Sequence, residues 1–406
     1  MAGALGDPVR HALESVLDAV RDRTDGAVAS YIPELAKVEP EQLGAALAST
    51  HGVVHEAGDV EAEFTIQSVS KPFVFALAVD ALGLHEVRKH VDLEPSGEPF
   101  NAISLDEASG RPRNPMINAG AIVMTSLMHG DTAEEKFAAV RAGLERFAGR
   151  ELEVDEDVYV SESTTGDRNR ALAYLTRSAG VLGASAQVAT TAYFRQCSLT
   201  VNARDLAIMA ATFATGGVNP VTDERVISED AARWTTAVMT SCGMYDESGD
   251  WMVRVGLPAK SGVGGGIAAV QPGQFGIGTF SPRLDERGNS VRGVATLELL
   301  SQRHGLHMLQ HHGSPLSPIA SLTREDAGDT IAMLRGEILF SEAEEVLTRL
   351  SALVGDHGCL VLDFTAVTRV AAGSRKIFSA LPETLGRLDD GRPRVEVRDP
   401  DGVLAG

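Results

Sequence analysis

The sequence predicts an α/β protein with a large, enzyme-sized domain followed by a small C-terminal module. Its 406 residues are enough for two to three average domains, and 44% of them are hydrophobic, which is typical of a globular chain. Helical patterns mix with glycine-rich, strand-like stretches over most of the length, whereas strands and helices alternate near the end. Two prolines, two serines and a glycine at 313–318 predict a linker, so we expect domains at 1–312 and 319–406.

Local patterns predict the elements of the first domain. Residues 1–23 have the pattern of a helix with a polar face, and helical periodicity recurs at 133–149, 203–216 and 229–239. Residues 262–278 are glycine-rich and apolar, which is typical of strands joined by tight turns. We expect a His-rich helical end at 303–312.

The second domain alternates between strand and helix patterns. We predict strands at 330–339, 359–364 and 395–397, and helices at 341–354 and 372–387. This alternation requires crossover connections, which place helices over a sheet.

Composition argues against several classes of function. Lys and Arg total 36 against 56 Asp and Glu, a net charge of −20, so repulsion disfavours nucleic acid and anionic membranes as partners. Three scattered cysteines fit neither a disulfide framework nor a CxxC metal site, and we expect no metal and no cofactor. We see no signal-peptide pattern and no apolar run near the ~18 residues that span a bilayer, so we expect a cytoplasmic protein.

The segment 64–83 contains a candidate nucleophile. We expect residues 64–67 to be extended and a helix to begin at Ser68, which places Lys71 on the same helical face. A neutral amine held against a serine hydroxyl can take its proton, which is the chemistry of a Ser-x-x-Lys pair. The alternative is a helix-capping serine beside a solvent-facing lysine. The apolar stripe predicted for this helix comprises Phe73, Leu77, Ala78 and Leu82.

A second motif occurs at Lys260-Ser261-Gly262. The form Lys-Ser/Thr-Gly is found on the strand that edges the pocket of Ser-x-x-Lys acyl-transfer enzymes. Glycines there let a substrate approach the backbone, so that the amide of Val263 can donate to an oxyanion. The alternative is a glycine-rich hairpin. Because the two motifs together use two of only six lysines, we favour a serine acyl-transfer hydrolase.

With these segments assembled, the chain resembles the serine-dependent glutaminases, a family of L-glutamine amidohydrolases. The strings that carry the resemblance are YIPELAK (31–37), QSVSK (67–71), EPSG (94–97), NPMINAGAI (114–122), SE (161–162) with GDRN (166–169), YF (193–194) before CS (197–198), SCGMYD (241–246) and GLPAKSGV (256–263). The resemblance extends from Tyr31 to about His307. It implies a β-lactamase-like fold, with an antiparallel sheet, helices and a helical subdomain, and a homodimer or homotetramer.

The resemblance also implies roles for individual residues. It makes Ser68 the nucleophile and Lys71 its base, with an acyl-enzyme intermediate. It places Tyr31 and Tyr245 on either side of the pair, and it makes the backbone amides of Val263 and Ser68 the oxyanion hole. It places Glu162 at the substrate ammonium. The neutral partners that it implies for the amino-acid end of the substrate are Gln67, Asn118, Asn169 and Tyr193. Tyr245 and Val263 would also contact substrate. We assign Arg168 to the scaffold.

Residues 319–406 resemble a STAS domain, an α/β module of anti-sigma-factor antagonists and transporter tails. The string CLVLDFTAVTRV at 359–370 carries this resemblance. Where signalling members have a phosphorylated serine, this chain has alanine, at 371–372, so we interpret the module as an appendage that binds a protein or a small ligand without a phospho-switch. The alternative is a working switch at Ser374.

Two other functions remain open at this point. A penicillin-recognising serine hydrolase shares both motifs, but we find no Ser-x-Asn motif near residue 162. A glutamine-sensing regulator that acts through the STAS-like module would bind glutamine without turnover.

Overall fold

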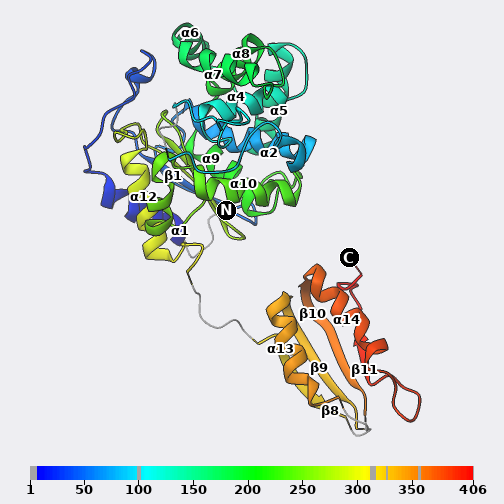
Figure 1. Cartoon of the computed structure of the whole chain (residues 1–406). Helices are drawn as coiled ribbons and strands as arrows, with labels where there is room; N and C mark the ends of the chain where they lie inside the picture. The colour runs from blue at the N-terminus through cyan, green and yellow to red at the C-terminus, as the bar shows by residue number, and fades with distance from the viewer. Residues whose placement is uncertain (1–6, 98–101, 311–316, 326–327, 355–357, 406) are drawn as a thin grey trace. The chain divides into compact units, whose positions relative to one another are not determined.

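The computed structural model describes residues 7–97, 102–310, 317–325, 328–354 and 358–405. The chain divides into two compact units, Met1–Gln310 and His311–Gly406 (Figure 1). Most of the predicted linker, residues 313–316, lies outside the described residues, so the domain limits stay a prediction.

A five-stranded antiparallel sheet forms the centre of the first unit. Its strands are β1 (Gly44–Ser49), β2 (Val54–Gly58), β5 (Ala259–Ser261), β6 (Gly266–Gln271) and β7 (Phe275–Phe280), in the order β2-β1-β7-β6-β5. β1 pairs with β7, with Leu47 opposite Ile277, so segments from both ends of the unit lie side by side. The strands and turns predicted for 262–278 are confirmed.

Helices cover both faces of this sheet. The three helices are α1 (Pro8–Val20), α9 (Ala203–Ala214) and α12 (Val291–His304). Because successive strand residues face opposite sides, Leu47 packs with α1 and α12, whereas Ala46 and Ala48 pack with α9. α12 ends at His304, two residues into the helical end predicted at 303–312, because Gly305 takes φ +65 and stops it. Residues 311–312 of that prediction lie outside the described residues.

Two glycines allow α9 to lie close to the sheet. A Cβ on Gly276 of β7 would lie 2.0 Å from the Ala211 nitrogen, and one on Gly278 would lie 2.1 Å from the Ala203 carbonyl oxygen. Any side chain there would therefore push α9 away from the strands.

The rest of the unit is mainly helical (Figure 1). Its elements are η1 (Leu35–Lys37), β3 (Phe64–Thr65), η2 (Gln67–Val69), α2 (Ser70–Leu82), α3 (Leu84–Val87), α4 (Asn118–Leu127), α5 (Ala133–Ala148), α6 (Glu156–Thr165), α7 (Asp167–Ser178), α8 (Ala186–Cys197), β4 (Thr200–Val201), α10 (Glu229–Cys242), η3 (Tyr245–Glu247) and α11 (Ser248–Arg254). The helices predicted at 133–149 and 229–239 are confirmed as α5 and α10.

The predicted start and stripe of α2 are wrong in detail. The 3₁₀ turn η2 contains Ser68, and the α-helix begins two residues later, at Ser70. α2 packs against α4, α5 and α10, so apolar residues surround it rather than forming one stripe. Leu82 of the predicted stripe is 42% exposed, because it lies at the end of the helix, before Gly83.

The second unit is a four-stranded sheet with two helices. Its elements are β8 (Ile319–Arg324), β9 (Thr330–Ile338), α13 (Phe340–Ser351), β10 (Leu360–Val370), α14 (Ala372–Thr384) and β11 (Val395–Arg398), with strand order β11-β10-β9-β8. β10 is parallel to both neighbours, whereas β8 is antiparallel to β9. In the core, Phe378 of α14 packs edge-on against Phe364 of β10.

The predicted alternation in this unit is confirmed, with two differences. β10 continues to Val370, six residues beyond the apolar run that predicted it. β8 has no counterpart among the predicted strands, because five of its six residues are exposed and leave no apolar pattern.

Gly278→Ala is expected to destabilise the first unit by about 1–3 kcal/mol, because the new methyl group overpacks the contact with α9. The control is Gly249→Ala, since Gly249 lies in α11 and a Cβ added there would have no atom within 4 Å. There we expect no loss, or a gain of up to ~1 kcal/mol from helix propensity. Urea unfolding measures both, and equal midpoints for the two variants would contradict the close approach of α9.

Candidate active site

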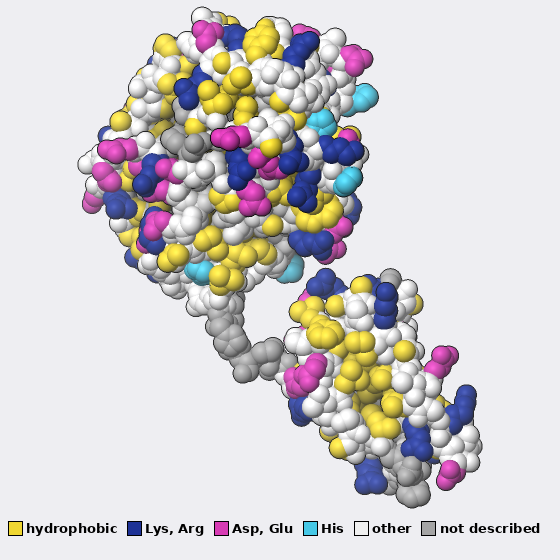
Figure 2. Space-filling view, viewed as in Figure 1, with side chains coloured by type: hydrophobic (Ala, Val, Ile, Leu, Met, Phe, Trp, Pro, Cys, Tyr) yellow, Lys and Arg dark blue, Asp and Glu magenta, His cyan; other side chains and the backbone are white. Residues whose placement is uncertain are grey.

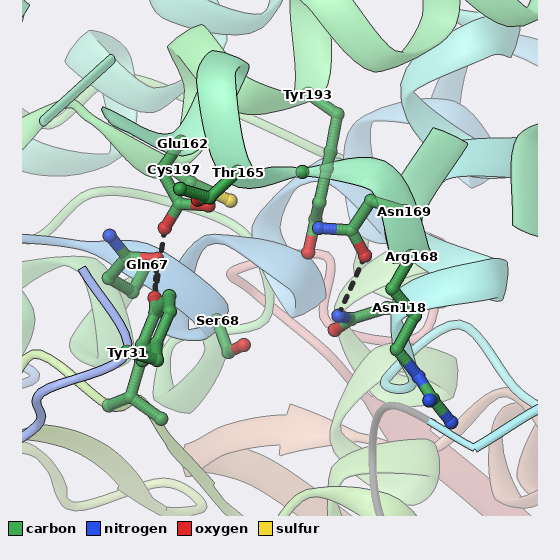
Figure 3. Close-up of a pocket in the computed structure, with 12 residues that line it drawn as sticks. Tyr31, Gln67, Ser68, Asn118, Glu162, Thr165, Arg168, Asn169, Tyr193 and Cys197 are labelled. Atoms are coloured by element: carbon green, nitrogen blue, oxygen red, sulfur yellow. Dashed lines mark hydrogen bonds between the residues drawn. The ribbon is translucent and has the colours of Figure 1, made fainter. Parts of the chain in front are cut away.

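A cavity of about 270 Å³ in the first unit brings together eight of the predicted site residues. They are Tyr31, Gln67, Ser68, Asn118, Glu162, Asn169, Tyr193 and Val263. In Figure 3 the side chains of Tyr31, Glu162, Tyr193 and Asn118 surround the Ser68 hydroxyl. Two further predicted residues, Lys71 and Tyr245, do not line the cavity but contact residues that do.

A strained turn presents Ser68. The strand β3 ends at Thr65, and Gln67 then takes φ +47, a left-handed conformation that is uncommon for a residue other than glycine. Gln67, predicted to be extended, is therefore in a turn instead. Ser68 is buried in this turn, directly before α2, where the helix dipole favours negative charge.

Lys71 is buried in the first turn of α2, so the alternative of a solvent-facing lysine is wrong. Its Nζ donates to Asn118 Oδ1 at 2.6 Å. A second hydrogen bond orients the Asn118 amide, because its Nδ2 donates to Asn169 Oδ1 at 3.0 Å (Figure 3). Burial lowers the pKa of Lys71 to about 8, so near neutral pH a useful fraction of this amine can accept a proton.

Tyr245 contacts Ser68, and Lys260 contacts Tyr245. The Tyr245 hydroxyl is hydrogen-bonded to the Ser68 side chain and donates to the Ser261 carbonyl at 3.1 Å. Lys260 Nζ lies 4.1 Å from the centre of the Tyr245 ring and donates to the same carbonyl at 2.5 Å. Burial, and then repulsion from Lys71, holds the pKa of Lys260 well below its usual range.

Glu162 gives the cavity a buried carboxylate. It comes from α6, and its Oε1 accepts a hydrogen bond from the Tyr31 hydroxyl at 2.8 Å (Figure 3). Burial raises the pKa of Glu162, while hydrogen bonds from Tyr31 and Gln67 oppose that rise. These partners are neutral, so the carboxylate can still pair with a cation that enters the cavity.

Four lining residues were not predicted as site residues: Thr165, Gly166, Arg168 and Cys197. Cys197 follows Tyr193 by one helical turn on α8, a spacing that could have identified it. Gly166 lies where α6 meets α7, and a Cβ there would lie 2.3 Å from the Phe194 ring. Arg168, assigned to the scaffold, lines the cavity, although Figure 3 shows its guanidinium pointing away from Ser68.

Two kinds of feature are absent from the described ranges. No three His, Cys, Asp or Glu side chains there gather as a metal site would require. None of the helices described is both long and apolar enough to cross a membrane.

Comparisons with known proteins agree with one another. Residues 26–309 match the family model described as Glutaminase. Glutaminase 1 of Bradyrhizobium diazoefficiens is 46% identical over 369 residues, which cover 90% of this chain but only 59% of that protein. Glutaminase of Corynebacterium glutamicum is 43% identical over 98% of this chain and 95% of its own length. The crystal structure of Mglu superposes with a TM-score of 0.88 at 42% identity, covering 98% of this chain and 99% of that one.

Proposed function

This chain belongs to the glutaminase family, and we propose that it hydrolyses the side-chain carboxamide of L-glutamine, with Ser68 as nucleophile. The products are L-glutamate and ammonia. The observation that carries the proposal is that Ser68 and the carboxylate of Glu162 line one cavity, and that the buried Lys71 amine, three residues after Ser68, donates to Asn118 of the same lining.

The reaction runs through an acyl-enzyme. Neutral Lys71 takes the proton of the Ser68 hydroxyl as the oxygen attacks the carboxamide carbon. The amides of Ser68 and Val263 stabilise the oxyanion. The proton then passes to the departing amide nitrogen, with the Tyr245 hydroxyl as relay, so that ammonia leaves and an ester to Ser68 remains. Water hydrolyses this ester to L-glutamate and restores the Ser68 hydroxyl.

The opposite wall of the cavity binds the amino-acid end of the substrate. Glu162 pairs with the α-ammonium, and Tyr31 and Gln67, which already hydrogen-bond Glu162, orient it. Asn169 and Tyr193 supply neutral donors for the α-carboxylate. Neutral donors suit this position because a cation there would compete with the substrate for Glu162.

We further propose that the second unit is a STAS-like module that binds a protein or a small ligand. Its support is the string at 359–370, most of which forms β10 between two parallel neighbours. Ser374 is fully buried, and its hydroxyl donates to the Leu339 carbonyl at 3.1 Å, which supports the loss of the phospho-switch. By the family resemblance and the composition, we propose a cytoplasmic homodimer or homotetramer.

Ser68→Ala is expected to abolish ammonia release from L-glutamine, while L-glutamate still binds, because its ammonium and carboxylate contacts lie elsewhere. Ammonia assays and calorimetric titration with L-glutamate measure the two properties. Hydrolysis of a chromogenic β-lactam by the wild-type protein, without ammonia release from glutamine, would instead support the penicillin-recognising alternative.

Because the neutral amine is the active form, kcat/KM for L-glutamine is expected to rise with pH through about 8, the pKa of Lys71. Lys71→Ala should lower kcat by ~10²–10⁴, and Lys71→Arg should not restore it, since guanidinium stays protonated. A Lys71→Ala enzyme that keeps more than about a tenth of wild-type kcat would contradict the role of Lys71 as general base.

Glu162→Gln is expected to raise KM for L-glutamine steeply, because the neutral amide cannot pair with the α-ammonium. The wild-type enzyme should turn over analogues that lack the α-amine poorly. Steady-state kinetics with both substrates measure this, and an unchanged KM in Glu162→Gln would show that Glu162 is only structural.

A further inference from the structure

A buried row of hydrogen bonds connects the backbone next to Ser68 with two other helices. The Ser70 hydroxyl of α2 donates to the Gln67 carbonyl at 2.7 Å, and Gln196 Nε2 of α8 donates to the Ser70 oxygen at 2.8 Å. Thr125 Oγ1 of α4 donates to Gln196 Oε1 at 2.7 Å. The residues Ser70, Gln196 and Thr125 are fully buried, and none of them lines the cavity.

The direction of these hydrogen bonds is fixed by the chemistry of the groups. The Ser70 hydroxyl has one proton, which goes to the Gln67 carbonyl, so its oxygen must accept from Gln196. The Gln196 amide satisfies this only with its nitrogen toward Ser70 and its oxygen toward Thr125. A carboxylate at 196 would lack the donor and would draw the Ser70 proton away from Gln67.

The row of hydrogen bonds ends at Gln67, the left-handed residue directly before Ser68. A left-handed residue other than glycine persists only where its surroundings enforce it. The Gln67 carbonyl accepts hydrogen bonds from both the hydroxyl and the backbone N–H of Ser70. The side-chain amide of Gln67 donates to Thr65 Oγ1 at 3.3 Å. Since Ser68 follows Gln67 directly, a relaxed Gln67 would move the Ser68 hydroxyl.

We propose that Gln196 is a positioning residue for the hydrolysis, which acts through Ser70 to hold the left-handed Gln67 turn and so aligns the Ser68 hydroxyl with Lys71. The proposal rests on the proposed function of Ser68. The same hydrogen bonds join the helices that carry Lys71, Asn118 and Tyr193, so they also fix the walls of the cavity relative to the nucleophile.

The test compares Ser70→Ala, Gln196→Met and the double variant. Ser70→Ala removes the bonds to Gln67 and from Gln196, and Gln196→Met removes the bonds to Ser70 and from Thr125, so the two variants share the loss of the Ser70–Gln196 bond. For each we expect kcat to fall about 10- to 100-fold, the loss typical of a nucleophile displaced by ~1 Å. Because both residues act through one contact, the double variant should be no slower than the slower single variant. Gln196→Glu should be at least as slow as Gln196→Met, because the donor to Ser70 is lost.

Thr190→Val is the matched control. Thr190 is equally buried on α8, but its hydroxyl donates only within its own helix, to the Ala186 and Gln187 carbonyls. This variant should lower the melting temperature while leaving kcat within about twofold of wild type. All kcat values are measured well below the melting temperature of each variant, so that a loss of stability alone does not lower them.

Three results would overturn the proposal: Ser70→Ala or Gln196→Met with kcat within twofold of wild type, losses that multiply in the double variant, or a Thr190→Val loss as large as theirs. If Gln196→Met does not fold, Ser70→Ala decides alone, because it removes a single oxygen. A wild-type enzyme that releases no ammonia from glutamine would contradict the proposed function, whereas an active wild type with an unimpaired Ser70→Ala contradicts this proposal only.

Discussion

The candidate active site depends on the burial of the Lys71 amine beside a neutral partner. A buried ammonium loses the solvation that water provides, and this loss brings the pKa of Lys71 down to about 8. A carboxylate beside it would reverse the effect, because an ion pair stabilises the protonated form. The partner is instead the Asn118 amide, which satisfies the amine without adding charge. The carboxylate of the site, Glu162, is engaged by Tyr31 and Gln67.

The turn η2, which holds Ser68, is connected to the central sheet through the short strands β3 and β4. β3, which leads into the turn, pairs with β4, and the Phe64 ring stacks on Phe280 of β7 at 4.1 Å. β4 leads into α9, which lies on β7 through the contacts at Gly276 and Gly278. β5, which carries Lys260, is the edge strand of the same sheet. The turn that holds Ser68 is therefore tied to the sheet through β3, β4 and α9, and also through direct contacts of η2 with β5 and β6.

Much of this site could be predicted from the sequence, because its residues lie in short, ordered strings. The motifs placed Ser68 and Lys71 one turn apart, and the resemblance supplied residues such as Glu162 and Tyr193, which the fold brings into one cavity. Cys197 could also be predicted as a lining residue, since it follows Tyr193 by one helical turn.

Other features depend on contacts that no local pattern encodes. The burial of Lys71 comes from the packing of α4, α5 and α10 around α2. Ser70 and Gln196 are separated by 126 positions, so their hydrogen bond leaves no trace in either segment. The turn at Gln67 was missed because a left-handed residue is usually a glycine, and here hydrogen bonds rather than residue type stabilise it.

The two buried lysines place a further constraint on the chemistry. Besides burial, the charge of Lys71 lowers the pKa of Lys260. Two nearby amines in a poorly solvated site cannot both be protonated without a large electrostatic free-energy cost. Lys260 contacts the carbonyl of Ser261 and the Tyr245 ring, and neither group carries a charge that would stabilise a second ammonium as a carboxylate would. In the proposed mechanism, in which Lys71 takes the proton of Ser68, protonation of Lys71 would therefore favour a neutral Lys260. With Lys260 neutral, the positive charge of that proposed step would be concentrated on Lys71, where it would favour the negative charge proposed to develop on the substrate oxygen.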